Sequence, residues 1–238
     1  DFDLPAGKCL AILGPSGSGK SSLAKLIVGV WAPSAGHVRI DGAEIDHWDP
    51  RQLGPHMGYL PQDVELFPGT IAENIGRFDT SNREAIIQAS QAAHAYELIL
   101  RLPQGFDTRL GEGGIQLSAG QAQRIGLARA LYGQPKVIVL DEPNANLDAE
   151  GELALLQALH DLKAHGSTLV LITHKPSLVG SMDYLMVMRE GQVELLGPRE
   201  EVLARLTGSQ QPPARGGSAD RPAAQTPGNG VVRAGSAA

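Results

Sequence analysis

Short runs of branched apolar residues alternate along this chain with segments of helical periodicity. Three runs of four or five residues have the length of strands: Cys9–Leu13, Val137–Leu140 and Thr168–Ile172. Because nearly every position in them is apolar, both faces of these strands are expected to be covered, as in a parallel sheet.

The segment between the last two runs has the spacing of a helix. Within residues 149–165, Leu155, Leu159 and Leu162 recur at intervals of four and three residues, and Gly166 follows as a stop signal. An amphipathic helix between two buried strands is typical of an α/β fold.

Residues 70–102 interrupt this alternation. Ile86, Ile87, Leu98 and Ile99 lie there among Ala, Gln and Glu residues, which predicts helices with no strand between them. We therefore expect an all-helical insertion, and two lobes within one folding unit of residues 1–207.

The two ends of the chain have different patterns. Asp1-Phe2-Asp3-Leu4 is typical of a strand that enters the turn at Pro5-Ala6-Gly7, and a further strand is expected to precede it. Residues 208–238 are mainly Gly, Ala, Pro, Ser and Gln, with Val231 and Val232 as the larger aliphatic residues. Such a composition buries too little surface to offset the entropy of ordering, so this tail is expected to be unstructured.

Composition narrows the class of protein. A chain of 238 residues with 42% hydrophobic content has room for one sizeable core and a smaller lobe. Its net charge of -6 lacks the basic excess of a nucleic-acid surface, so no nucleic-acid partner is expected. The single Cys9 excludes an intramolecular disulfide and favours a reducing compartment. No apolar run approaches the roughly 20 residues that span a bilayer.

A glycine-rich phosphate-binding motif follows the first apolar run. The pattern GxxxxGK[ST] is matched by Gly14, Pro15, Ser16, Gly17, Ser18, Gly19, Lys20 and Ser21, and Ser22 extends the candidate ATP-binding set. Glycines let backbone N–H groups turn toward phosphates, and the following helix adds its positive dipole end. Lys20 would reach the β and γ phosphates, and Ser21 would coordinate the Mg²⁺ cofactor. The alternative is a turn that only caps a helix, but all fixed positions match.

A second motif is the apolar strand Lys136–Glu142, which ends in two carboxylates. Asp141 suits the Mg²⁺ shell, through water, whereas Glu142 would accept or orient the proton of the attacking water beside the γ phosphate. The alternative is a strand that ends in a solvated acidic turn. The phosphate-binding motif upstream makes that alternative the weaker one.

Between these motifs lies Leu117-Ser118-Ala119-Gly120-Gln121. Together, the three motifs resemble the nucleotide-binding domain of ABC transporters over residues 1 to about 207. The resemblance implies an α/β fold: a P-loop NTPase core with a mainly parallel sheet, an antiparallel β portion and an α-helical subdomain inserted within about 62–120. It also implies a homodimer, in which Ser118, Ala119, Gly120 and Gln121 form a signature turn that faces the phosphate loop of the second copy. Ser118 and Gly120 would contact the γ phosphate there.

Three further positions match the family residue by residue. Gln62 corresponds to the Gln loop, which senses Mg²⁺ and the attacking water, and Asp148 corresponds to the D-loop at the dimer interface. His174 corresponds to the switch histidine that contacts the γ phosphate. The resemblance therefore implies a catalytic set of Lys20, Gln62, Glu142 and His174, with Ser21, Gln62 and Asp141 around the metal.

The chain departs from the family pattern at two positions. Ala119 replaces a glycine of the signature, and because alanine disfavours positive φ, we expect a helical backbone there. Ala145 removes a hydroxyl that the D-loop often carries. The adenine-stacking aromatic residue of the family precedes Phe2, and neither Trp31 nor Trp48 matches its position.

Two loops resemble those of exporters. Residues 62–75 and 108–114 are similar to the segments that contact the intracellular helices of exporter membrane domains; the alternative is two ordinary surface loops. The phrases QDVELFPGTIAEN and DEPNANLDAEGE are most similar to type I secretion ATPases. That resemblance implies a membrane domain earlier in the same polypeptide, a periplasmic adaptor, an outer-membrane channel, and a position on the cytoplasmic face of the bacterial inner membrane.

Two other functions stay open at this point. One is a lipid, peptide or drug exporter, because substrate contacts lie largely in the membrane domain. The other is a soluble ABC mechanoenzyme that acts on nucleic acid or ribosomes. The acidic net charge and the exporter-like loops argue against the second alternative.

Overall fold

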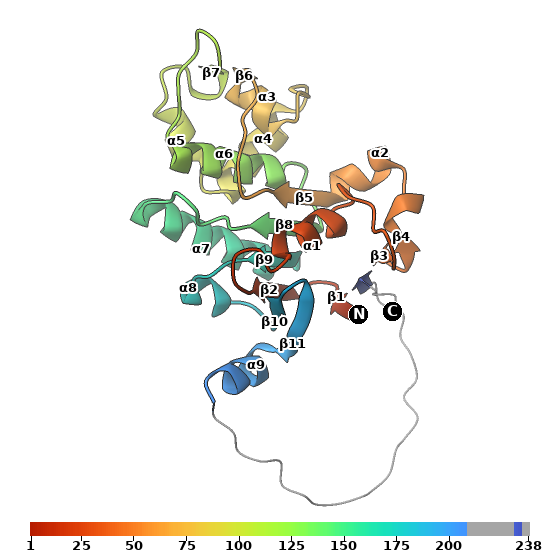
Figure 1. The fold of residues 1–238 in the computed structure, drawn as a ribbon. Helices are drawn as coiled ribbons and strands as arrows, with labels where there is room; N and C mark the ends of the chain where they lie inside the picture. Colours follow the sequence, from red (N-terminus) through yellow and green to blue (C-terminus); the bar gives the residue numbers. More distant parts are fainter. Residues whose placement is uncertain (209–230, 235–238) are drawn as a thin grey trace, which may run out of the picture.

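A six-stranded sheet in the order β11-β10-β2-β9-β8-β5 forms the centre of the computed structural model, which describes residues 1–208 and 231–234 (Figure 1). Its inner pairs are parallel, and β11 joins the edge antiparallel to β10. The strands are β1 (Phe2–Pro5), β2 (Cys9–Leu13), β3 (Val38–Ile40), β4 (Ala43–Glu44), β5 (Met57–Leu60), β6 (Gly69–Thr70), β7 (Arg109–Leu110), β8 (Val137–Asp141), β9 (Thr168–Ile172), β10 (Tyr184–Arg189), β11 (Gln192–Pro198) and β12 (Val231–Ala234).

Helices cover this sheet and build a second lobe. They are α1 (Lys20–Ile27), α2 (Pro50–Leu53), α3 (Ile71–Ile75), α4 (Arg83–Ala92), α5 (Tyr96–Leu100), α6 (Ala119–Leu131), α7 (Ala149–Ala164), α8 (Pro176–Val179) and α9 (Arg199–Leu206). Short 3₁₀ turns lie at Ile45–His47, Gly54–His56 and Gly105–Asp107. The mainly parallel sheet confirms the expected fold class.

The predicted strands and the predicted helix lie where the apolar pattern placed them. Strands β2 and β9 have the expected bounds, and α7 ends one residue before the predicted end. Strand β8 extends one residue beyond its apolar run, because Asp141 still pairs with Ile172 of β9. Backbone pairing therefore carries the Asp141 carboxylate into the sheet, at the end of the strand, as the motif Lys136–Glu142 predicts.

Alternate residues of β2 serve two separate cores. Ala11 packs in the same buried cluster as Leu159 of α7, whereas Ile12 packs in the cluster that contains Ile27 of α1. All four side chains are 0% or 1% exposed. The parallel strands are thus covered on both faces, as their continuous apolar runs require.

The helical lobe comprises α3 to α6 and lies beyond β5 and β8 (Figure 1). Its centre is made of the fully buried Ile71, Ile75, Ile86, Ile99 and Ile125, which join the same cluster as the α7 face of the sheet. Because one apolar cluster runs through both lobes, they share a core.

A smaller antiparallel sheet has the order β1-β12-β3-β4. The tail prediction differs from the structure at Val231–Ala234, where β12 pairs with β1 and β3. Two adjacent valines favour a strand, and the edges of β1 and β3 supply its backbone partners. The rest of the predicted tail, residues 209–230 and 235–238, lies outside the described residues.

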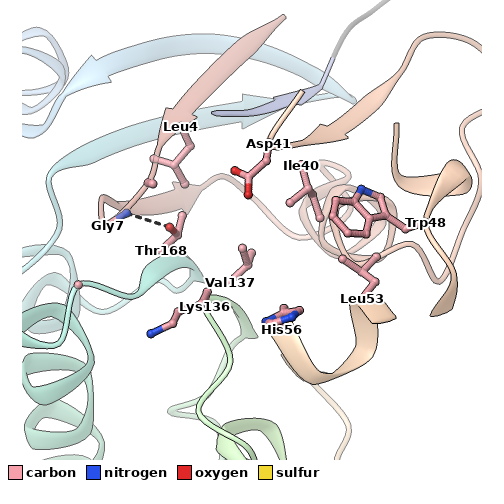
Figure 2. A pocket seen from close by; sticks show the side chains of 12 residues that line it. Leu4, Gly7, Ile40, Asp41, Trp48, Leu53, His56, Lys136, Val137 and Thr168 are labelled. Atoms are coloured by element: carbon pink, nitrogen blue, oxygen red, sulfur yellow. Dashed lines mark hydrogen bonds between the residues drawn. The ribbon is translucent and has the colours of Figure 1, made fainter. Parts of the chain in front are cut away.

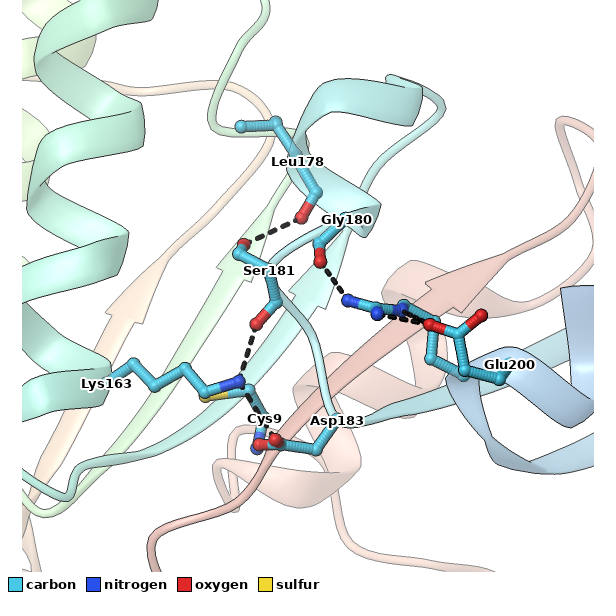
Figure 3. A network of polar contacts seen from close by, with 8 residues as sticks. Cys9, Lys163, Leu178, Gly180, Ser181, Asp183 and Glu200 are labelled. Carbon is cyan, nitrogen blue, oxygen red and sulfur yellow. Dashed lines mark hydrogen bonds and ion pairs between the residues drawn. The ribbon is translucent and has the colours of Figure 1, made fainter.

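Hydrogen bonds and an ion pair connect the C-terminal end of α7 to the central sheet. Figure 3 shows the Lys163 ammonium, which donates to the Ser181 carbonyl at 2.7 Å and to Asp183 Oδ1 at 2.8 Å. Asp183 Oδ2 in turn accepts from the Cys9 backbone N–H at 2.9 Å. Burial raises the pKa of the Cys9 thiol to about 11, so this cysteine stays protonated and unreactive at neutral pH.

No helix within residues 1–208 and 231–234 has both the length and the apolarity to cross a membrane.

The two faces of α7 provide a test of this packing. Leu159 is 1% exposed and Leu153 is 68% exposed, so Leu159→Ala removes core contacts whereas Leu153→Ala removes almost none. We expect Leu159→Ala to lower the free energy of unfolding by about 2 to 5 kcal/mol. Urea denaturation measures this, and an equal loss in Leu153→Ala would contradict the assigned faces.

Candidate functional site

The predicted phosphate loop connects the carboxyl end of β2 with α1. Gly19 caps the helix with a φ of 92°, and Gly14 and Gly17 also have positive φ values. At Gly14, an added Cβ would lie 2.2 Å from the Met188 carbonyl oxygen, so no side chain fits there. The loop therefore brings backbone N–H groups and the α1 N-terminus to one surface, an arrangement that suits an anion.

Lys20 lies over this loop and is only 6% exposed. Its ammonium donates to the carbonyls of Gly14 and Pro15, both at 2.8 Å, and lies 3.4 Å from the Ser18 hydroxyl. A buried ammonium held by loop carbonyls is positioned to meet phosphate oxygens that enter the loop.

Asp141 ends β8 beside α1 and is 1% exposed. Burial raises the pKa of this carboxyl group, although a hydrogen bond with Ser21 acts in the opposite direction. Its Oδ1 has no hydrogen-bond partner among the described residues. A buried carboxylate with an open oxygen beside a serine hydroxyl is a donor set that fits a hard divalent cation such as Mg²⁺.

Glu142 lies at the centre of three loops. Gln62 donates from Nε2 to Glu142 Oε2 at 3.3 Å, and His174 Nε2 lies 3.0 Å from Glu142 Oε1. These residues follow β5, β8 and β9, which are adjacent parallel strands, so their loops meet at one edge of the sheet. Three residues far apart in the sequence therefore form one hydrogen-bonded group.

Glu142 reaches this position through an unusual backbone conformation. Its φ is +48°, and its N–H donates to the Ile172 carbonyl at 2.9 Å. A left-handed residue directly after a strand turns the chain sharply and aims the carboxylate away from the sheet. The side chain is 26% exposed, so it is open to a reactant as well as to its two partners.

A first cavity of about 210 Å³ joins the phosphate loop to this group. Its lining is Ser16, Gly17, Gly19, Lys20, Ser21, Ser22, Gln62 and Glu142. The phosphate loop, the candidate metal ligand Ser21 and the candidate base Glu142 thus line the same cavity.

The signature turn lies elsewhere, at the start of α6. Ser118 caps this helix through the Gln121 N–H, and Gln121 Oε1 accepts from the Ser118 N–H at 2.9 Å. Ala119 is the first helical residue, as expected. An added Cβ at Gly120 would lie 2.7 Å from the Asn146 carbonyl oxygen, so a glycine is needed where the two loops touch.

A second cavity of about 570 Å³ contains this turn. Its lining includes Ser118, Ala119, Gly120, Gln121, Asn146 and Asp148, together with Arg101 and Arg124. Asp148 caps α7 by accepting from the Gly151 N–H at 2.8 Å. The predicted residues therefore fall into two groups, and one chain does not bring the signature turn to its own phosphate loop cavity.

A third cavity, of about 400 Å³, lies at the amino ends of β8 and β9, opposite the phosphate loop. Figure 2 shows Trp48 and Leu53 on one side of it and Leu4 on another, with Asp41 directed inward. It contains none of the predicted site residues. Trp48 therefore lies at the end of the sheet opposite the phosphate loop.

Sequence reasoning missed two features of the site. Arg101 and Arg124 line the second cavity, and Asn144 forms a hydrogen bond to the loop of His174. The signal for Asn144 was its place two residues after Glu142, within the phrase DEPNANLD. Arg101 carried no local signal, because it caps the end of α5 and reaches this cavity only in the folded lobe. Arg124 lies three residues after Gln121 on α6, a spacing that could have pointed to it.

Comparison with known proteins gives matches over most of the chain. The ABC transporter family model matches residues 1–145. The type I secretion system ATP-binding protein PrsD of Rhizobium meliloti (strain 1021) is 52% identical over 212 residues, which are 89% of this chain and 36% of that protein. The ATP-dependent lipid A-core flippase of Methylococcus capsulatus is 41% identical over 219 residues, 91% of this chain and 35% of that protein.

A solved structure shows the same similarity. The structure of a bacterial Atm1-family ABC exporter with ATP bound aligns with a TM-score of 0.77 and 35% identity, over 86% of this chain and 36% of that chain. The chain thus spans about a third of the length of each of these three proteins.

Burial of the Asp141 carboxylate is expected to lower the free energy of unfolding when no ion is bound. Because its pKa is raised in the folded chain, its protonation favours folding, and this contribution is lost as the pH rises through the raised pKa. Asp141→Asn should therefore raise the free energy of unfolding at pH 7 by about 1 kcal/mol, without nucleotide or Mg²⁺. The gain should shrink as the pH falls and Asp141 becomes neutral.

Urea denaturation between pH 4 and pH 7 measures this difference, with the exposed Asp63→Asn as the matched control. If Asp141→Asn were less stable than the unsubstituted chain at pH 7, the ionised carboxylate would stabilise the fold. That result would contradict its description as a buried carboxylate with an unpaired oxygen.

Proposed function

Because the chain belongs to the ABC transporter family, as an ATP-binding domain of exporter type, we propose that it is the ATP-hydrolysing motor of a type I protein secretion exporter. The observation that carries the proposal is the hydrogen-bonded group of Gln62, Glu142 and His174, which shares a cavity with the phosphate loop.

ATP would bind with its phosphates against the loop Gly14–Ser22. Backbone N–H groups and the α1 N-terminus face that position, and Lys20 would exchange loop carbonyls for phosphate oxygens. Mg²⁺ would be held by Ser21 and, through water, by Asp141, with Gln62 nearby. The ion supplies positive charge to the phosphates when bound.

Glu142 would act as the general base. Its carboxylate is held between an amide and an imidazole, so its position is set before a water molecule is oriented for attack on the γ phosphate. His174 is half exposed at this edge and would contact the γ phosphate once ATP is bound. Gln62 and His174 would thus both orient Glu142, and His174 would also contact the γ phosphate.

A second copy would complete each site. Within one chain, the signature turn at Ser118 opens into a cavity separate from the phosphate loop. A homodimer would place this capped helix start, a favourable anion site, on the γ phosphate bound by the partner. ATP would then hold the dimer closed, and hydrolysis would release it.

The helical lobe would transmit this movement to a membrane domain. The two exporter-like loops are joined by a short sheet, in which Gly69 and Thr70 of β6 pair with Leu110 and Arg109 of β7. Beside it, Phe67 and Phe78 expose rings whose centroids are 5.6 Å apart.

The loop that presents Phe67 is held from within. The backbone N–H and carbonyl of Phe67 are both hydrogen bonded to the side chain of Asn74, at 2.8 Å and 3.0 Å, and Asn74 is 1% exposed. The Arg129 guanidinium lies over the Phe67 ring, 5.5 Å from its centroid. An apolar patch on such a rigid support suits the apolar side of an incoming helix.

The identity of the cargo rests on similarity. The secretion protein PrsD is 52% identical to this chain, whereas the lipid A-core flippase is 41% identical, which favours protein secretion over lipid transport. On this proposal, the full transporter would place the chain on the cytoplasmic face of the inner membrane and would work with a periplasmic adaptor and an outer-membrane channel.

Glu142→Gln tests the assignment of the base. This variant keeps the phosphate loop and the size of the side chain, so ATP affinity should stay within about twofold while kcat falls about 100-fold or more. We also expect an ATP-bound dimer that persists in size-exclusion chromatography. The control is Glu84→Gln, which changes an exposed glutamate of α4. Turnover by Glu142→Gln near that of the control would reject Glu142 as the principal base.

Ser21→Ala tests the metal ligand. Loss of the hydroxyl should weaken Mg²⁺-ATP binding about tenfold, while affinity for ATP in EDTA should be nearly unchanged, because the phosphate contacts of the loop remain. Calorimetry with and without Mg²⁺ distinguishes these effects, and Ser177→Ala on the exposed start of α8 is the control. Equal Mg²⁺-ATP affinity in Ser21→Ala and the control would remove Ser21 from the metal site.

A further inference from the structure

The loops that follow β8 and β9 are connected by three successive hydrogen bonds. The Glu142 N–H donates to the Ile172 carbonyl at 2.9 Å, and Glu142 Oε1 lies 3.0 Å from His174 Nε2. Between these, the Thr173 hydroxyl donates to Asn144 Oδ1 at 3.0 Å. Asn144 has no place in the phosphate loop, the signature turn or the catalytic group.

Both hydrogen-bonding roles of the Thr173 hydroxyl are used. It donates to Asn144 and accepts from the Lys175 N–H at 3.1 Å, and the residue is 0% exposed. The side chain therefore fixes the backbone on both sides of His174. A buried hydroxyl with two partners has few alternative positions, so the loop of His174 has one preferred conformation.

His174 itself has little else to hold it. Its side chain is 53% exposed, and Glu142 is its hydrogen-bond partner in the described part of the chain. The direction of its ring thus depends on the backbone between Thr173 and Lys175. Loss of the contact to Asn144 would free the loop to move away from Glu142.

Asn144 also lies between the two cavities. Glu142, on one side of it, lines the phosphate-loop cavity, and Asn146 and Asp148, on the other side, line the signature cavity. The residue next to it, Ala145, has no hydroxyl with which to make a contact of its own. The D-loop of this chain is therefore tied to the switch loop through the amide of Asn144.

We propose that Asn144 is a positioning residue for hydrolysis, which holds His174 toward Glu142 through the Thr173 hydroxyl. This inference rests on the proposed ATPase function. It assigns a role to a residue that acts through Thr173 and does not itself touch ATP. Its effect is expected on turnover and not on nucleotide affinity.

The test compares variants of Asn144 and Thr173 in the full chain. Asn144→Ala removes the acceptor, and Thr173→Val removes the hydroxyl at nearly constant volume. Each should lower kcat about five- to tenfold, with the Kd for Mg²⁺-ATP within about twofold of the unsubstituted chain. The kcat of the double variant should lie within about twofold of the kcat of the slower single variant, because both changes break the same hydrogen bond.

Two comparisons separate positioning from a general loss of structure. Thr173→Ser retains the hydroxyl and should recover most of the kcat that Thr173→Val loses. Asn82→Ala removes the asparagine that caps α4 and lines neither of the two cavities, so it should lower the Tm without changing kcat at a temperature where the variant stays folded. Thermal melts by circular dichroism identify any variant that is unfolded in the assay.

The outcomes are distinct. A normal kcat in Asn144→Ala overturns the inference. An equal loss of kcat in Thr173→Ser and Thr173→Val also overturns it, because the loss would then not be specific to the hydroxyl. If Asn144→Ala unfolds, the two Thr173 variants decide. No ATP hydrolysis by the unsubstituted chain would instead overturn the proposed function, on which the inference depends.

Discussion

The parallel pairing of neighbouring strands places the candidate chemistry at one edge of the sheet. In a parallel ladder the carboxyl ends of the strands lie side by side, and the pairs Leu60–Leu140, Asp141–Ile172 and Ile12–Ile172 set how far each strand reaches. The loops that follow must then meet. The phosphate loop, Gln62, Glu142 and His174 all depend on that register, and a slip of one residue in β8 would turn Asp141 to the opposite face.

The same sheet creates an electrostatic cost at its edge. Pairing draws Asp141 into a layer covered on both faces, where burial raises its pKa and leaves one oxygen without a partner. A fold selected for stability alone would place an apolar or neutral residue there. Glu142, one residue further along, escapes this burial through its left-handed backbone. Adjacent carboxylates thereby have different surroundings, one suited to an ion and the other to a reactant.

Separation of the two cavities is the second consequence of the fold. The signature turn belongs to the helical lobe and the phosphate loop to the sheet, so the two lie in separate cavities, and on the proposed function each would be half of an ATP site. Between them runs the segment from Glu142 to Asp148, which lines one cavity at its start and the other at its end. The hydrogen bonds of Glu142, Asn144 and Asp148 fix this segment at its start, middle and end.

Local patterns were enough to predict much of this protein. Continuous apolar runs gave strands, leucine spacing gave α7, and the requirement for glycine and lysine at fixed spacing gave the phosphate loop, since these depend on neighbours in the sequence. Tertiary structure decided the rest. It formed β12 from a segment whose composition predicts disorder, and it brought Asn144 to Thr173. These outcomes depend on partners that lie far along the chain, and only strand pairing and packing determine which partners meet.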